Sequence, residues 1–297
     1  MRKTLRQAMM DGVHFLQSHQ IEDAISDGRI LFEAAFSIDR THYLLNGDQE
    51  ADPDRERVYQ QYLRQRVQGK PVQYIIEGQE FMGLSFYVDP RVLIPRQDTE
   101  TLVEAVLSDM EEQKITLKAA DIGTGSGCIA VSIAAFRKEA VQMTATDLSA
   151  GALQVAEVNA RRNDVSLRLL QGNLLEALPE EEKRTWHYII SNPPYISDRD
   201  MQNLERNVRE FEPRLALSGG EDGLKYYREL GVQAKDHLRP GGQLWLEIGW
   251  DQGSSVSQIL AQEGYQNVQI RKDLAGHDRV VSASYLGIEK DRGENRV

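Results

Sequence analysis

The sequence has 297 residues, with 35 Lys plus Arg, 46 Asp plus Glu and a single Cys. This length favours two domains and leaves ample chain for a sizeable core. Because no apolar run approaches the roughly 18 residues that span a bilayer, and Asp11 and His14 interrupt the N-terminal stretch, neither a membrane protein nor a signal peptide is expected. One Cys permits no internal disulfide, which fits a cytoplasmic location.

The negative charge is distributed unevenly. Residues 1–75 carry 10 basic and 11 acidic side chains, whereas the remainder carries 25 and 35. Proteins that bind a phosphate backbone usually show a basic stripe, because cation contacts supply much of that affinity. No direct nucleic-acid partner and no membrane partner are therefore expected.

Residues 1–75 are predicted to form a small helical domain. Apolar side chains recur at three- and four-residue steps between Leu5 and Leu16 and again between Ala24 and Ala35. Asp52-Pro53, inside a polar stretch, marks a break between helices.

Residues 76–95 are predicted to form a β-hairpin linker. The extended pattern consists of Phe81, Gly83, Phe86 and Val88, then a turn signal at Asp89-Pro90, then Val92–Ile94.

From residue 96 to residue 290, predicted strands alternate with predicted helices, which indicates an α/β fold with a mostly parallel, doubly wound sheet. The predicted strands are Ala119–Ile122, Val141–Thr146, Leu167–Gln171, Trp186–Ser191, Gln243–Ile248, Val268–Arg271 and Val280–Tyr285. The predicted helices are Cys128–Arg137, Ala150–Arg162, Leu224–His237 and Val256–Glu263, and Arg239–Gly242 is expected to separate a helix from the strand after it.

A glycine-rich loop, Asp121–Gly127, follows the first of these strands and opens a helix. Its glycines allow a tight turn, and free N–H groups at the helix start are expected to attract an anionic group. Asp147 ends the next strand, where a carboxylate can accept both hydroxyls of a ribose. Together they indicate an adenosine-containing cofactor, either NAD or S-adenosyl-L-methionine, without choosing between them.

The motif Asn192-Pro193-Pro194-Tyr195 follows a later strand, at the sheet edge where such folds bind ligands. The Asn192 oxygen and a carbonyl of the proline segment can accept both hydrogens of a planar –NH₂ group, and Tyr195 offers an aromatic face. A conjugated nitrogen is a poor nucleophile until it is positioned by such acceptors, so the motif favours nitrogen methylation over hydride transfer.

Taken together, these three motifs resemble the class I S-adenosylmethionine-dependent methyltransferases that modify amino or amide nitrogens. Three further segments resemble the PrmC/HemK family of release factor glutamine methyltransferases: Val92–Glu100, Glu212–Leu217 and Gly219–Leu224. The resemblance covers nearly the whole chain.

The resemblance implies a Rossmann-like, seven-stranded sheet and a helical N-terminal domain that docks the protein substrate. It also implies transfer of a methyl group to the side-chain amide nitrogen of the glutamine in the Gly-Gly-Gln motif of class 1 peptide chain release factors. A cytoplasmic location and a monomeric state are expected. The residues implied to bind the cofactor are Gly123, Thr124, Gly125, Ser126, Gly127, Asp147, Asn173, Leu174 and Asn192. The residues implied to be catalytic and to hold the substrate amide are Asn192, Pro193, Pro194 and Tyr195, with Arg96 and Thr99 shaping the entrance.

One position departs from the family pattern, since Asn173-Leu174 stands where relatives often carry an acid and an aromatic residue beside the adenine. The histidines show no metal-ligand spacing, so no metal is expected. Three alternatives remain open: an adenine-N6 methyltransferase acting on DNA or RNA, an NAD-dependent dehydrogenase, and a non-catalytic binding protein.

Overall fold

The computed structural model describes residues 3–287 and divides the chain into two units. One unit comprises the chain up to Gly78 together with Leu204–Glu212, and the other comprises Gln79–Asn203 and the chain from Pro213 onward. Among residues 3–287, no helix is both long enough and apolar enough to cross a membrane.

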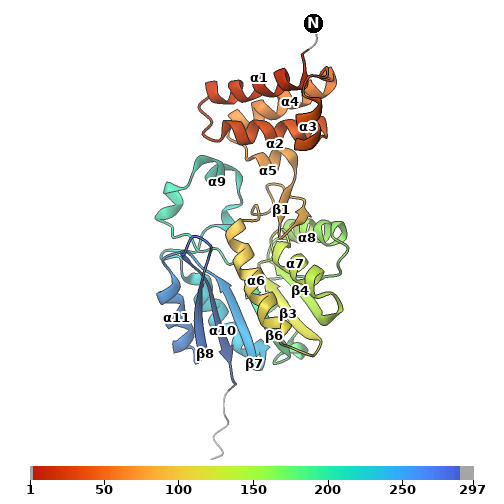
Figure 1. Ribbon diagram of the computed structural model, residues 1–297. Helices are drawn as coiled ribbons and strands as arrows, with labels where there is room; N and C mark the ends of the chain where they lie inside the picture. Colours follow the sequence, from red (N-terminus) through yellow and green to blue (C-terminus); the bar gives the residue numbers. More distant parts are fainter. Residues whose placement is uncertain (1–2, 288–297) are drawn as a thin grey trace, which may run out of the picture. The chain divides into compact units, whose positions relative to one another are not determined.

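The first unit is helical, so the predicted helical character of residues 3–75 is confirmed (Figure 1). Its helices are α1 (Leu5–Ser18), α2 (Ala24–Phe36), α3 (Arg40–Asn46), α4 (Pro53–Val67), α5 (Val72–Ile76) and, from the second segment, α9 (Arg206–Phe211). The Asp52-Pro53 signal marks the start of α4, where the Asp52 side chain accepts a hydrogen bond from the Asp54 N–H and proline occupies the first turn.

The core of this unit consists of apolar side chains that the helical periodicity places on one face of each helix. Leu16, Leu31, Phe32 and Leu63 are all fully buried. Tyr59 is buried with them, and its hydroxyl donates to the Gly28 carbonyl oxygen at 2.9 Å. This hydrogen bond satisfies the one polar atom that the ring carries into the core.

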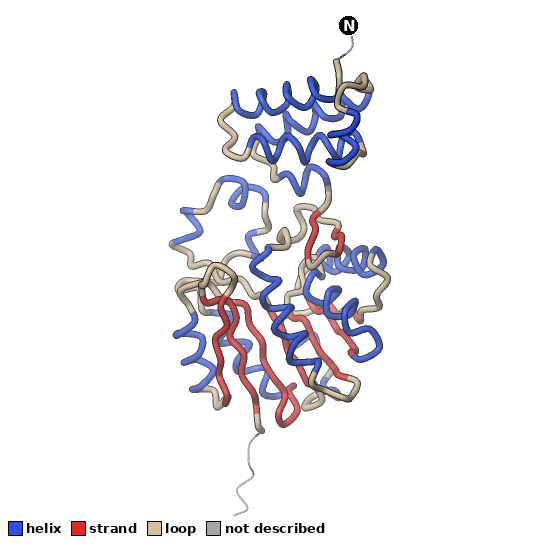
Figure 2. The backbone as a smooth tube through the Cα atoms, viewed as in Figure 1, coloured by secondary structure: helices blue, strands red, loops and turns tan. Residues whose placement is uncertain are grey.

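The second unit contains a hairpin and a seven-stranded sheet with helices on both faces (Figure 2). Its strands are β1 (Gln79–Phe81), β2 (Leu84–Phe86), β3 (Leu117–Ile122), β4 (Val141–Asp147), β5 (Arg168–Gln171), β6 (Trp186–Ser191), β7 (Leu238–Glu247), β8 (Gln266–Lys272) and β9 (Asp278–Tyr285). Its helices are α6 (Gln97–Glu111), α7 (Cys128–Arg137), α8 (Ala150–Arg162), α10 (Lys225–His237) and α11 (Gly253–Gln262), with short 3₁₀ turns at Lys138–Ala140, Leu174–Ala177, Glu180–Glu182, Asp200–Asn203 and Arg214–Ala216.

The sheet has the order β5-β4-β3-β6-β7-β9-β8. The strands from β5 to β7 pair in parallel, and β9 pairs antiparallel with both β7 and β8. The predicted seven-stranded, mostly parallel sheet is therefore confirmed. The strand order reverses at β3, which lies between β4 and β6. Open α/β sheets bind ligands at such a switch point.

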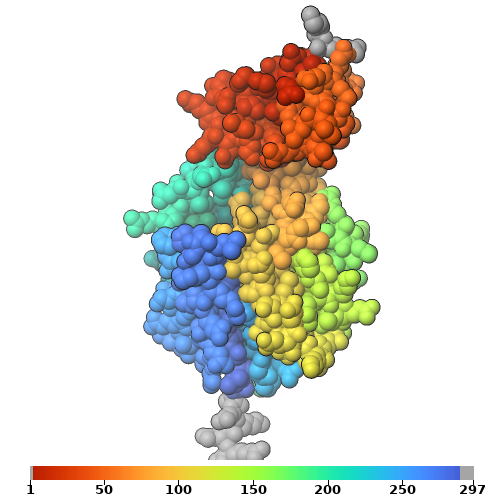
Figure 3. Space-filling view, viewed as in Figure 1, coloured from red at the N-terminus to blue at the C-terminus, as the bar shows by residue number. Residues whose placement is uncertain are grey.

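Alternate residues of the strands face two hydrophobic cores, one on each side of the sheet. Ala119 and Ile190 face the core that contains α6 and α7 residues, whereas Ala120 and Ile189 face the core that contains α10 and α11 residues. In the space-filling view, α6 (yellow) forms a strip of surface between the β7–β9 side (blue) and the α7–α8 side (green) (Figure 3). The sheet is thus buried on both faces, as a parallel sheet requires.

Two sequence predictions need correction. The hairpin is shorter than predicted, because β1 and β2 turn at Met82-Gly83 and Val92–Ile94 forms no strand. The strand predicted to begin at Gln243 begins at Leu238 instead, so Arg239–Gly242 lies within β7. Proline and glycine are tolerated there because the pairing with β6 is irregular between Trp186 and Tyr188.

Candidate active site

The loop between β3 and α7 forms an open cradle of backbone. Gly123 and Gly125 have φ angles of +74° and +55°, and a Cβ atom at either position would have no neighbour within 4 Å. Left-handed backbone of this kind disfavours L-residues by roughly 1–2 kcal/mol each. The loop therefore needs glycine at both positions, and the space above them is free for a ligand.

The N–H groups of this loop are engaged within the protein. Gly123 and Thr124 donate to the Thr146 carbonyl oxygen at 2.9 and 2.8 Å, and Gly127 donates to the Thr124 carbonyl oxygen at 2.8 Å. Gly125 donates to Oδ2 of Asp147 at 2.9 Å. Four of the five residues from Gly123 to Gly127 therefore use their N–H groups within the protein, and three of these bonds tie the loop to the end of β4.

Asp147 lies at the end of β4, beside the glycine loop. Besides the bond from Gly125, its Oδ1 accepts a hydrogen bond from the Ser149 N–H at 2.8 Å. A carboxylate has about four acceptor sites, so roughly two remain for ribose hydroxyls. Burial raises the pKa of Asp147 despite the backbone hydrogen bonds that oppose the shift. Ser149, not Asp147, caps α8, since its side chain accepts from the Ala152 N–H.

Two buried side chains stabilise the loop by hydrogen bonds. Asp121 accepts a hydrogen bond from the Thr124 hydroxyl at 2.6 Å, and burial raises the pKa of this carboxyl to about 7. Asn159 of α8 donates to the Ser126 carbonyl oxygen at 2.8 Å and to the Tyr87 carbonyl oxygen at 2.9 Å. Asn159 was not predicted as a site residue, because its only signal in the sequence is that of a polar residue on the buried face of a helix.

Asn192 follows β6 at the same edge of the sheet. The Ser191 hydroxyl donates to the Ile122 carbonyl oxygen at 2.6 Å, which ties the end of β6 to the end of β3. The Asn192 side-chain nitrogen donates to Oγ1 of Thr99 in α6 at 3.2 Å. Because its nitrogen is turned toward Thr99, the amide keeps its oxygen as an available acceptor.

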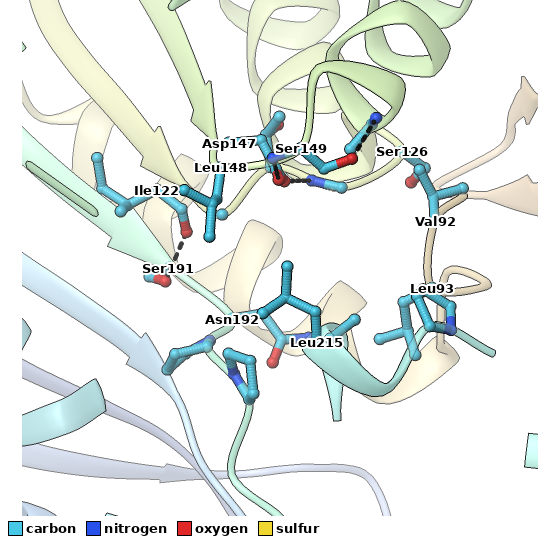
Figure 4. A pocket seen from close by; sticks show the side chains of 18 of the residues that line it. Val92, Leu93, Ile122, Ser126, Asp147, Leu148, Ser149, Ser191, Asn192 and Leu215 are labelled. Atoms are coloured by element: carbon cyan, nitrogen blue, oxygen red, sulfur yellow. Dashed lines mark hydrogen bonds between the residues drawn. The ribbon is translucent and has the colours of Figure 1, made fainter. Parts of the chain in front are cut away.

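These segments enclose a single pocket (Figure 4). Its lining includes twelve of the residues selected from the sequence: Arg96, Thr99, Gly123, Thr124, Gly125, Ser126, Asp147, Asn173, Leu174, Asn192, Pro193 and Pro194. Leu148 lies opposite Val92 and Leu93 across the cavity (Figure 4). The pocket thus combines apolar walls with a few convergent polar groups, as small-molecule sites generally do.

Two of the selected residues are not among those that line this pocket. A Cβ atom on Gly127 would lie 3.0 Å from the Cβ of Ala156, so this glycine allows α7 and α8 to approach closely. Tyr195 packs against the hydrophobic core, and burial raises the pKa of its hydroxyl to about 12. Its carbonyl oxygen accepts a hydrogen bond from the Gln252 side chain at 3.1 Å.

The pocket is also lined by residues that were not predicted as site residues. Val92–Pro95, Leu215 and Tyr226 contribute to its wall. Val92–Glu100 is one of the segments that resemble the family, but no spacing rule distinguishes a pocket wall from an ordinary extended segment. Cys128 also lines the pocket, and burial raises the pKa of its thiol to about 12, so a reactive thiolate is disfavoured.

The seven-stranded sheet, the glycine cradle beside Asp147 and the Asn192 motif together define a class I methyltransferase. Residues 7–76 match the family model described as the PrmC N-terminal domain, and residues 97–221 match the methyltransferase small domain. The chain belongs to the family of release factor glutamine methyltransferases.

Individual relatives agree with this membership. The release factor glutamine methyltransferase of Moorella thermoacetica is 43% identical over 279 residues, covering 93% of this chain and 96% of the relative. The protein of the same name from Clostridium acetobutylicum is 38% identical over 286 residues, covering 96% and 99%. Among solved structures, the hMettl16 catalytic domain in complex with the MAT2A 3′UTR hairpin 1 shares the fold at 17% identity and a TM-score of 0.54, covering 81% of this chain and 84% of that one.

Proposed function

We propose that this protein transfers a methyl group from S-adenosyl-L-methionine to the side-chain amide nitrogen of the glutamine in the Gly-Gly-Gln motif of class 1 peptide chain release factors. The observation that carries the proposal is the orientation of Asn192, whose nitrogen donates to Thr99 at 3.2 Å inside a pocket shared with the glycine cradle and Asp147. Release factors take part in translation, so the proposed place of action is the cytoplasm.

The residues around the cradle fit the cofactor. Gly123 and Gly125 leave open space where side chains would obstruct a ligand, and Asp147 retains acceptor capacity for ribose hydroxyls. Thr124, Ser126 and Gly127 shape the same loop. Asn173 and Leu174 are proposed to flank the adenine, Asn173 as a hydrogen-bonding partner and Leu174 as an apolar surface. When bound, S-adenosyl-L-methionine supplies an electrophilic methyl group attached to a positively charged sulfur.

The chain's contribution to the reaction is to hold the amide nitrogen. An amide lone pair is delocalised into its carbonyl, so the nitrogen is weakly nucleophilic until its geometry is constrained. The Asn192 oxygen and a carbonyl of Pro193-Pro194 accept the two amide hydrogens and direct the lone pair toward the cofactor side of the pocket. Prolines suit this role because they lack N–H groups that would compete as donors.

The remaining members of the motif complete the substrate site in this proposal. Tyr195 anchors the end of the motif in the hydrophobic core, outside the pocket lining, and Arg96 and Thr99 shape the pocket. The helical N-terminal domain docks the release factor. Two glycines before the target glutamine let its loop enter a narrow cleft without side-chain clashes.

The proposal is tested by incubating the purified protein with S-adenosyl-L-methionine carrying a radioactive methyl group and one of three acceptors. The first acceptor is an unmodified class 1 release factor, the second is the same factor with the Gly-Gly-Gln glutamine replaced by Asn, and the third is adenine-containing DNA or RNA. We expect label in the first acceptor only. Label in the nucleic acid, or equal label in the two release factors, would contradict the proposal.

A further inference from the structure

A buried carboxyl group lies behind the candidate active site. Glu247 ends β7, the residue is 1% exposed, and it is not among the residues that line the pocket. Its Oε2 atom is buried and makes no hydrogen bond of normal geometry within the described residues. An unpaired buried carboxyl oxygen costs free energy, so its retention at the end of this strand calls for an explanation.

The neighbours of Glu247 connect it to the pocket. The Thr99 hydroxyl and the Asn192 side chain both interact with the carboxyl and favour its charged form. Thr99 is buried, at 2% exposed, and its oxygen already accepts the hydrogen bond from Asn192 at 3.2 Å. The single Thr99 proton is therefore free to point toward another acceptor, and the Glu247 carboxylate is the charged acceptor beside it.

We propose that Glu247 is a positioning residue which, through the Thr99 hydroxyl, fixes the Asn192 amide with its nitrogen turned inward and its oxygen presented to the substrate amide. This inference rests on the proposed function of Asn192. When the Thr99 hydroxyl donates its only proton to Glu247, its oxygen can only accept, and it accepts from the Asn192 side-chain nitrogen. If the hydroxyl proton pointed to Asn192 instead, the amide would turn round and present a donor where the substrate also carries donors.

Other charged and titratable groups surround Glu247. Arg279 of β9 favours its charged form, while Asp98 of α6 opposes it. Arg279 in turn pairs with Asp98 at 2.9 Å and with Asp273 at 3.1 Å, so its charge is shared among several carboxyl groups. Two tyrosines also lie near Glu247: Tyr195, which follows β6, and Tyr227 of α10.

Burial outweighs these partners and raises the pKa of Glu247 to about 7. The charged form, which accepts from Thr99, therefore increases as the pH rises through about 7. Turnover should rise over the same range, and it should lose this dependence when position 247 cannot ionise.

The substitution Glu247→Gln keeps the size of the side chain and replaces an acceptor by a group that can also donate to Thr99. We expect kcat to fall by roughly 10- to 100-fold, with a smaller change in KM for the release factor, and the rise through pH 7 to disappear. Thr99→Val should have a similar effect, and the double variant should be no worse than either single one, because both remove the same relay. Thr99→Ser should recover most of the activity.

The matched control is Glu182→Gln. Glu182 is a partly buried carboxylate that pairs with Lys118 and Arg168, at the amino ends of β3 and β5. This variant should keep the wild-type kcat and pH profile. Unfolding midpoints and the affinity for S-adenosylhomocysteine, measured for every variant, distinguish a positioning effect from loss of structure.

A second measurement does not depend on catalysis. The side-chain ¹⁵N–¹H₂ signals of Asn192, assigned by their loss in Asn192→Ala, should shift with pH near 7 in the wild type and stay constant in Glu247→Gln. If the wild type is inactive on the release factor but the signals titrate, the proposed function fails and the relay stands. Signals that do not titrate, or a Glu247→Gln variant with wild-type kcat and pH profile, would overturn the relay.

Discussion

Replacing Gly125 by Ala tests whether the glycine cradle holds the cofactor. The φ angle of +55° predicts a loss of roughly 1–2 kcal/mol in the free energy of unfolding, because L-residues are strained there. The added methyl group would meet no protein atom within 4 Å, so the fold itself has room for it. A ligand seated in the cradle would meet it, and overpacking of this kind costs roughly 1–3 kcal/mol, which corresponds to about 5- to 150-fold weaker binding.

The control is Gly264→Ala, since Gly264 has a φ of +86°, also has no neighbour within 4 Å of a Cβ atom, and follows α11 away from the pocket. Unfolding midpoints should fall by similar amounts in the two variants. Calorimetric titration with S-adenosylhomocysteine should show weaker binding for Gly125→Ala only. Equal ligand affinity in the two variants would refute the assignment of the cradle.

Three further predictions concern Asn192, Asp121 and the helical unit. Asn192→Ala should abolish most turnover while leaving the affinity for S-adenosylhomocysteine within a modest factor, because it removes the proposed acceptor for the substrate amide; near-normal kcat would exclude Asn192 from the mechanism. Burial raises the pKa of Asp121 to about 7. The folded protein therefore binds the carboxyl proton of Asp121 more tightly than the unfolded chain does, and the stability that this proton contributes at low pH is lost as the pH rises through about 7. The free energy of unfolding of the wild type, measured with denaturant, should therefore fall between pH 5 and pH 8 by more than that of Asp121→Asn. Parallel pH dependences of the two proteins would contradict the raised pKa of Asp121. Leu63→Ala, at a fully buried position of α4, should lower the stability of the helical unit by roughly 2–5 kcal/mol in circular dichroism melts, and a loss below about 1 kcal/mol would show that the site is loosely packed.

Much of the fold could be predicted because apolar periodicity is strong in this chain. The strand Trp186–Ser191 and the helices Cys128–Arg137 and Ala150–Arg162 have the predicted bounds, since each is a sustained buried pattern bounded by clear turn or cap residues. The prediction was wrong where pairing with a neighbouring strand decided the outcome. Pro240 and Gly241 would normally end a strand, yet the irregular pairing with β6 lets β7 include them.

The lining of the pocket was predictable where it consists of short motifs. The glycine loop, Asp147 and Asn192 lie on neighbouring strand ends of one sheet edge, so their convergence follows from the parallel topology. The use of the loop N–H groups was not predictable, because it depends on how closely β4 approaches the loop. The contact between Asn192 and Thr99 joins residues 93 positions apart, and no local pattern encodes it.

The location of the transferred methyl group on the acceptor is the most direct test of the proposed function. The protein would be incubated with S-adenosyl-L-methionine and an unmodified class 1 release factor, and the factor would be digested and examined by tandem mass spectrometry. We predict one added methyl group on the side chain of the Gly-Gly-Gln glutamine. Absence of that methyl group, with both proteins shown to be folded, or its appearance on another residue, would contradict the proposed function.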